Sequence, residues 1–137
     1  MVYVVVDTNV LVSALPSKNE DSCTVVIRKH IFDGTITPLF NDEIFKEYYD
    51  VLHRPKFQLP TEQVDSILEA IAEQGMMLGR TKTDEVFPDP TDIMFYEVAI
   101  SKEGSFLVTG NTKHFPKTPI VVSPAELIEI LDNKEKE

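Results

Sequence analysis

The first seven residues constrain the fold of this chain more than any other stretch. Five apolar residues, Val2–Val6, are followed directly by Asp7. A continuous run of mostly β-branched residues is typical of a strand that is buried on both faces, as in a parallel sheet. A carboxylate at the end of such a strand lies at the edge of an α/β sheet where ligands bind. The run therefore predicts a central strand that carries Asp7 into a ligand-binding crevice.

Strand-like and helical patterns alternate along the rest of the chain, which favours βαβ units and a parallel sheet. Further strands are expected at residues 35–40, 76–78, 105–108 and 120–122. Helices are expected at residues 8–15, 22–33, 42–53, 61–74, 89–104 and from 124 onward. The helices at 42–53 and 61–74 form a hairpin inserted between strands. Cys23, Val26, Ile27 and Ile31 are expected on the buried face of their helix.

The length and the ends of the chain predict a single domain over residues 1–131, followed by a charged, frayed tail at 132–137. Cys23 is the only cysteine, so no internal disulfide and no thiol-based zinc site can form, and a cytoplasmic location is expected. The opening apolar run is too short and lacks the basic lead of a signal peptide, and no stretch is long enough to span a membrane.

Polar residues are expected to converge at one edge of the sheet. They are Asp7 after the first strand, Glu47 on the helix at 42–53, Asp89 and Asp92 at the start of a helix, and Asn111 after the fourth strand. Crowded carboxylates repel one another, and a divalent cation removes that cost. Mg²⁺ prefers oxygen ligands, and it can activate water for attack on a phosphodiester. The pattern thus predicts a magnesium-dependent site for phosphodiester hydrolysis.

Each of these residues also has a structural explanation. Asp7 and Asp89 can cap the helices that follow them. Asp92 can complete a cap or interact favourably with the positive end of the helix dipole. Asn111 follows a glycine, as turn residues often do. Glu47 is the hardest to explain in this way, because it lies within the apolar stripe of Ile44, Tyr48 and Val51. Its structural alternative is an ion pair with a lysine or arginine at a helix end.

The overall charge argues against a nucleic-acid partner. The chain has 13 basic and 23 acidic residues, which gives a net charge of −10. Proteins that bind nucleic acid without sequence preference normally carry the opposite sign. Any RNA contact must come from a local basic patch, for which Arg54 and Lys113, with Lys56 and His114, are the candidates. The alternative for Arg54 is an ordinary cation at a helix end.

Four stretches, in this order along the chain, resemble the motifs of PIN-domain nucleases. They are residues 4–11 around Asp7, residues 42–57 around Glu47, Asp89–Asp92 with Ala99, and residues 107–111 followed by 113–116. The second stretch is similar to that of the VapC-like toxin components of toxin–antitoxin systems. The resemblance covers nearly the whole chain.

The resemblance implies a three-layer α/β/α sandwich with a central parallel sheet of four to five strands. It also implies cleavage of single-stranded RNA with Mg²⁺ or Mn²⁺. Asp7, Glu47 and Asp92 match the family's metal-binding acids, and Asn111 stands at a fourth catalytic position that is commonly acidic. Thr8, Asn9, Thr109 and Asp89 match or neighbour the supporting positions. A small antitoxin protein and a second copy of the chain are the partners that the resemblance implies.

Two other functions fit parts of the sequence. A non-catalytic PIN-fold module that binds RNA or protein would account for the net charge of −10 and for the neutral Asn111. A phosphoryl-transfer domain of the receiver or haloacid-dehalogenase type would also place an acid after its first strand. Receivers need a second acid at the end of a later strand, where this chain has Phe40-Asn41. The dehalogenase type needs an aspartate at the position of Asn9.

Overall fold

The computed structural model describes residues 1–16 and 19–135, so part of the loop predicted at 17–20 and the last two residues of the predicted tail lie outside it. The helices and strands are β1 (Val2–Val6), α1 (Thr8–Ala14), α2 (Cys23–Asp33), β2 (Ile36–Phe40), α3 (Asp42–Leu52), α4 (Thr61–Gln74), β3 (Met76–Met77), α5 (Ile93–Ala99), β4 (Phe106–Val108), β5 (Val121–Val122) and α6 (Pro124–Glu135). Three single 3₁₀ turns join them, namely η1 (Pro55–Phe57), η2 (Pro90–Asp92) and η3 (Thr112–His114).

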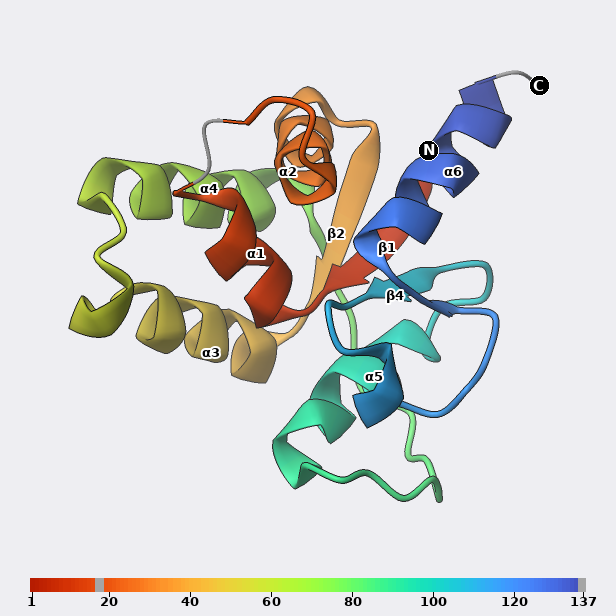
Figure 1. The fold of residues 1–137 in the computed structure, drawn as a ribbon. Coiled ribbons are helices and arrows are strands. Elements are labelled where there is room, and N and C mark those ends of the chain that lie inside the picture. Colours follow the sequence, from red (N-terminus) through yellow and green to blue (C-terminus); the bar gives the residue numbers. More distant parts are fainter. Residues whose placement is uncertain (17–18, 136–137) are drawn as a thin grey trace.

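The five strands form one parallel sheet in the order β3-β2-β1-β4-β5, as the alternating sequence pattern predicts (Figure 1). β1 lies in the middle, with Val4 opposite Pro38 of β2 and Val6 opposite Val108 of β4. The chain adds strands on one side of β1 up to β3 and then crosses to the other side at β4. Right-handed crossovers place helices on opposite faces when the direction reverses in this way. The fold is therefore a three-layer α/β/α sandwich.

The reversal of strand order decides where a ligand can bind. In an open parallel sheet, the crevice lies at the carboxyl ends of the two strands from which the chain leaves in opposite directions. These strands are β1 and β4, which end at Val6 and Val108. The residues that follow them, Asp7 and Thr109, therefore begin the crevice.

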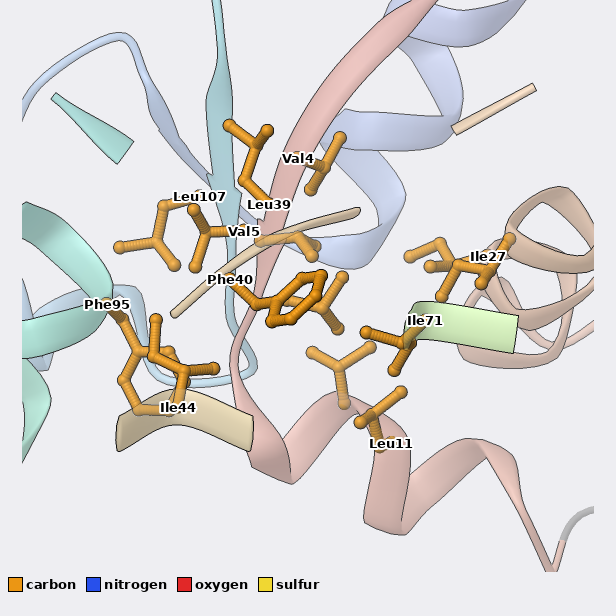
Figure 2. Packing of buried hydrophobic residues seen from close by; sticks show 14 of the residues in the cluster. Val4, Val5, Leu11, Ile27, Leu39, Phe40, Ile44, Ile71, Phe95 and Leu107 are labelled. Atoms are coloured by element: carbon orange, nitrogen blue, oxygen red, sulfur yellow. The ribbon is translucent and has the colours of Figure 1, made fainter. Parts of the chain in front are cut away.

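Two apolar layers hold the sheet in place. Val4 and Val5 of β1 are fully buried and point to opposite faces, because side chains alternate along a strand. Figure 2 shows them between Phe95 of α5 and Leu107 of β4 on one side and residues of α1, α2 and α4 on the other. α5 packs against β1, β2 and β4, whereas α2 packs against β2 and the helices α1, α4 and α6.

The predicted helix starts are confirmed where capping residues mark them. The Asn41 side chain accepts a hydrogen bond of 2.8 Å from the backbone N–H of Ile44 at the start of α3. Ser123 and Glu126 form the predicted capping box of α6, in which each side chain accepts from the backbone N–H of the other, at 2.9 and 3.2 Å. Such caps are local, so the sequence alone can specify them.

Three helix predictions need correction. The helix expected at 89–104 begins as the turn η2 and ends at Ala99. The carbonyl of Ala99 accepts a hydrogen bond of 2.7 Å from the hydroxyl of Ser105. In α2, Val25 is buried, whereas Cys23 and Val26 are only half-buried. α6 continues to Glu135, into the charged tail that was expected to be frayed at 132–137.

Within the described residues, no helix combines the length and the apolar character that crossing a membrane requires.

Candidate active site

Asp7 lies directly after β1 and is 7% exposed. Its carboxylate accepts a hydrogen bond from the hydroxyl of Thr109 at 2.8 Å and one from the side-chain amide of Asn9 at 3.3 Å. Asp7 occupies the N-cap position of α1, but its side chain makes no capping hydrogen bond. Capping therefore does not account for this acid. The two residues that hold its carboxylate lie after the two strands of the crevice, Asn9 in α1 and Thr109 directly after β4.

Glu47 reaches the crevice from α3, where its neighbour Tyr48 is buried. The hydroxyl of Thr8 donates a hydrogen bond of 2.5 Å to one Glu47 oxygen. The hydroxyl of Tyr48 donates to the carbonyl of Val6, the last residue of β1. Consecutive residues of α3 thus attach the helix to the end of β1, one through a carboxylate and one through a phenol.

Asp92 is the last residue of η2 and Asp89 is its N-cap residue, but their side chains have different surroundings. Asp89 caps the turn, since one of its oxygens accepts from the backbone N–H of Thr91 at 3.0 Å and from its hydroxyl at 2.8 Å. The Asp92 side chain makes no capping hydrogen bond and is 15% exposed. Its one ion-pair partner among the described residues is His114, at 3.8 Å. Capping therefore accounts for Asp89 and leaves Asp92 unexplained.

The pKa values of these acids indicate uncompensated negative charge. Burial raises the pKa of Asp7, against the effect of the Thr109 hydrogen bond. Burial and the charge of Asp7 raise the pKa of Glu47, against the hydrogen bond from Thr8. Burial and the charges of Asp7 and Asp89 raise the pKa of Asp92 to about 6. By contrast, the hydrogen bonds from Thr91 lower the pKa of Asp89. The first three acids therefore share a site that favours a bound cation or a proton.

Asn111 lies at the rim of the crevice. Its backbone N–H donates to the hydroxyl of Thr109 at 3.0 Å, and the N–H of Gly110 donates to the side-chain oxygen of Asn9 at 3.1 Å. The Asn111 side chain is exposed and does not cap η3. The backbone of Asn111 thus stabilises the turn after β4. Its side-chain amide is exposed to solvent, at the position that is commonly acidic in the family that the sequence resembles.

The basic candidates lie around the crevice at different places. Arg54 is close enough to Glu47 for its positive charge to oppose the rise in the pKa of that carboxyl. His114 faces Asp92. Lys113, the residue before it, lines a neighbouring cavity together with Lys117.

A further cation at this site, Arg80, was not among the residues predicted from the sequence. It lines a hollow of about 290 Å³ together with Glu47 and Thr91. Its guanidinium donates to Glu43 at 3.0 Å and to Glu97 at 2.8 Å, so its charge is shared between two acids. Glu97 stands inside an apolar run of α5. The same signal that singled out Glu47 would have marked Glu97 as an acid that needs a partner, without identifying Arg80.

No three His, Cys, Asp or Glu side chains among the described residues are close enough together to hold a metal ion as they stand. The chemistry of the acids nevertheless fits a hard divalent cation, because Asp7, Glu47 and Asp92 offer oxygen donors whose raised pKa values show that Arg54 and His114 offset their charge only in part. Mg²⁺ in particular is usually bound by one or two carboxylates, with water and substrate oxygens completing its coordination.

Fold and site together define a three-layer α/β protein with a carboxylate-lined crevice where the strand order of its parallel sheet reverses. The chain belongs to the PIN domain family, because the sequence model of that family matches residues 3–113. PIN domains are generally nucleases, so the family indicates a nuclease-type hydrolytic function. The match covers every acid of the crevice and gives no support to a receiver or dehalogenase fold. No curated protein and no solved structure matches the chain.

Proposed function

We propose that this protein is a metal-dependent endoribonuclease that hydrolyses phosphodiester bonds of single-stranded RNA. The observation that carries the proposal is the group of Asp7, Glu47 and Asp92. These acids come from three separate elements, and all have raised pKa values. Among the described residues, none of the three forms an ion pair with a lysine or arginine. Acids with a purely structural role are normally paired.

In this proposal, Asp7, Glu47 and Asp92 hold Mg²⁺ or Mn²⁺. The bound ion supplies Lewis-acid chemistry, by which water becomes a nucleophile and the charge on the phosphoryl oxygens is stabilised. Thr109 and Thr8 fix the orientation of Asp7 and Glu47 through their hydrogen bonds. Hydroxyl groups suit this task, because they orient a carboxylate without neutralising it.

Asn111 contributes a neutral oxygen at the rim of the crevice. An amide carbonyl can hold a water molecule or a substrate hydroxyl, but it adds no charge. The site therefore has three carboxylates in place of the four that many family members are expected to carry. Asp89 lies near enough to raise the pKa of Asp92, and it adds negative charge at the same edge.

Basic residues around the acids bind the RNA backbone in this proposal, because a protein with a net charge of −10 does not attract RNA in general. Arg54 lies on the Glu47 side and Lys113 on the Asp92 side, next to His114. In this proposal, a strand of RNA contacts both cations and passes over the three acids. This arrangement presents a phosphate to the crevice and keeps the flanking phosphates on cations.

The experiment that tests this function compares the wild type with Asp7→Asn, Glu47→Gln and Asp92→Asn on a fluorescein-labelled single-stranded RNA, with Mg²⁺, with Mn²⁺ and with EDTA. We expect cleavage by the wild type only with metal, and a loss of at least about 100-fold in each variant. Each substitution preserves the shape of the side chain. Equal cleavage by the wild type and Asp7→Asn would refute the proposal.

A toxin role in a toxin–antitoxin pair is the second part of the proposal. It rests on the similarity of residues 42–57 to VapC-like toxins. The antitoxin would be a small protein with a basic side chain that reaches the acids, and the toxin would form a homodimer. Expression of the wild type should arrest growth, expression of Asp7→Asn should not, and co-expression of a small neighbouring reading frame should restore growth. Sedimentation of the purified chain tests the dimer.

The neutral Asn111 and the net charge favour one alternative, a PIN module without catalytic activity that binds RNA or a protein. Calorimetry with Mn²⁺ separates the two functions. The nuclease binds the ion in a manner that depends on Asp7. The module binds RNA or a protein partner and takes up no Mn²⁺ at about millimolar concentration.

A further inference from the structure

A cavity of about 560 Å³ lies beside the acidic crevice. Its walls come from the segment that follows β4, which leaves the sheet near α5 and returns to it as β5 (Figure 1), and from the start of α6. Lys113 and Lys117 contribute ammonium groups, Phe115 and Pro116 contribute apolar surface, and Glu126 contributes a carboxylate. Its volume falls in the range of about 300–1,000 Å³ that is usual for small-molecule sites.

The turn η3 separates this cavity from the crevice. His114 points toward Asp92, and its ring nitrogen lies 3.8 Å from a carboxylate oxygen. Lys113, the residue before His114, lines the cavity instead. Adjacent residues of one turn thus face the two sites. A ligand in the cavity lies next to any group that occupies the crevice.

The charges in the cavity are unevenly placed. Neither Lys113 nor Lys117 forms an ion pair with any residue in the described part of the chain, whereas Lys29 and Arg80 do. Glu126 lies on the α6 side, where hydrogen bonds from Ser123 lower its pKa and keep it ionised. A phosphate is therefore attracted to the lysines and repelled by Glu126. The remaining Glu126 oxygen can only accept hydrogen bonds.

We propose that this cavity binds one nucleotide of the RNA substrate, next to the phosphodiester that is cut. The inference rests on the proposed nuclease function. The nucleotide's phosphate lies on Lys113 and Lys117, and its base lies against Phe115 and Pro116. The base edge meets Glu126, which favours a base with an exocyclic amino group, such as adenine or cytosine, over uracil.

The charge reversal Lys117→Glu tests the phosphate side of the cavity. We expect KM for a single-stranded RNA of about ten nucleotides to rise about tenfold, with the loss in KM rather than kcat. The matched control is Lys102→Glu. Its ammonium group lies over the ring of Tyr3, 4.3 Å from the centroid, near the amino end of β1 and away from the crevice. The control changes the net charge equally and should leave KM within about twofold.

The variant Glu126→Gln tests the base side. Glutamine preserves the capping box with Ser123, so α6 should keep its start. Because an amide also donates hydrogen bonds, the preference for adenine over uracil at this position should fall. RNAs that differ only in the nucleotide flanking the cut provide the measurement. An unchanged preference, or an equal effect of Lys117→Glu and Lys102→Glu on KM, overturns the proposal.

Two further measurements separate failure of the cavity from failure of the nuclease function. Turnover of bis(p-nitrophenyl) phosphate requires the acids but does not fill the cavity, so Lys117→Glu should lose far less activity on it than on RNA. Titration of the EDTA-treated wild type with adenosine monophosphate should shift the amide NMR signals of residue 117 and Val121. The signals at the same two positions should not shift in Lys117→Glu. If no substrate is cleaved, the nuclease function fails, and the titration still decides whether the cavity binds a nucleotide. Absence of those shifts overturns the proposal.

Discussion

The hydroxyl of Thr109 donates a hydrogen bond of 2.8 Å to the carboxylate of Asp7, across 102 positions of sequence. Both residues follow the ends of neighbouring strands, β1 and β4. Thr109 is fully buried, and its oxygen also accepts from the backbone N–H of Asn111 at 3.0 Å. One hydroxyl thus fixes the first acid of the crevice and the turn after β4.

Replacement of Thr109 by valine should lower the stability of the fold and raise the pKa of Asp7. Valine has nearly the same shape but leaves Asp7 and the Asn111 N–H without their partner, which costs about 1–3 kcal/mol in the free energy of unfolding. The Thr109 hydrogen bond lowers the pKa of Asp7, so its loss raises that pKa further. The acid limb of the pH–rate profile should move to higher pH, and Thr109→Ser should retain the wild-type profile. A profile that valine does not move would contradict this role.

Asp92→Asn should stabilise the metal-free protein at neutral pH. The pKa of Asp92 is raised to about 6 from a usual value of 3.8, so the ionised form is disfavoured in the folded state. This penalty is present above pH 6 and vanishes as the pH falls below the unfolded value near 4. After allowance for solvent screening, we expect a gain of about 1–2 kcal/mol at pH 8 and none at pH 4.

Urea denaturation in EDTA at several pH values measures the effect of Asp92→Asn. Asp89→Asn is the matched control, because asparagine caps as well as aspartate and the pKa of Asp89 is lowered rather than raised. It removes only the contribution of Asp89 to the raised pKa of Asp92, so its gain at pH 8 should be clearly smaller than that of Asp92→Asn. A gain for Asp92→Asn that stays constant from pH 4 to pH 8 would exclude a charge effect.

Divalent metal should stabilise the folded protein and compete with protons. At about 100 times its dissociation constant, a bound ion adds about 2.7 kcal/mol to the free energy of unfolding. Because the raised pKa values must be overcome, the apparent affinity should fall as the pH drops below about 6. Thermal unfolding with and without Mn²⁺ is the measurement. The shift should disappear in Asp7→Asn and persist in Glu103→Gln, which removes an exposed acid outside the crevice.

Glu97→Gln should loosen the loop between β3 and η2. Glu97 accepts from the backbone N–H of Thr83 and from Arg80, each at 2.8 Å, and it is 7% exposed. Glutamine keeps the size but loses the charge that holds Arg80. Amide hydrogen exchange at Thr83 should become at least about tenfold faster. The exposed partner Glu43 provides the comparison, since Glu43→Gln should change this exchange far less.

The sequence predicts the features of this fold that depend on short stretches. The apolar run Val2–Val6 identifies the central strand, and the box of Ser123 and Glu126 identifies the start of α6. The pairing of Arg80 with Glu97 depends instead on how a loop folds over α5. The early end of α5 coincides with a hydrogen bond from the hydroxyl of Ser105 to a carbonyl six residues back. Such contacts are set by the tertiary structure, so no local pattern announces them.

The candidate site follows the same division. The order of strands and acids along the chain was enough to predict that Asp7, Glu47 and Asp92 approach one another. The Asp-Pro start of the helix also predicts Asp89 as the cap, and the structure confirms this, since the Asp89 side chain caps η2 and that of Asp92 caps nothing. The roles of these acids toward a metal stay predictions.

The central position of β1 has a consequence for protein synthesis. β1 is synthesised long before β4, so its pairing with β4 must wait until Val108 has been made. Until then one edge of an apolar strand stays open, and Asp7 lacks the hydroxyl of Thr109. A chain that ends before β4 therefore lacks one of the two strands that form the crevice and the hydroxyl that holds Asp7, so it cannot form the complete site.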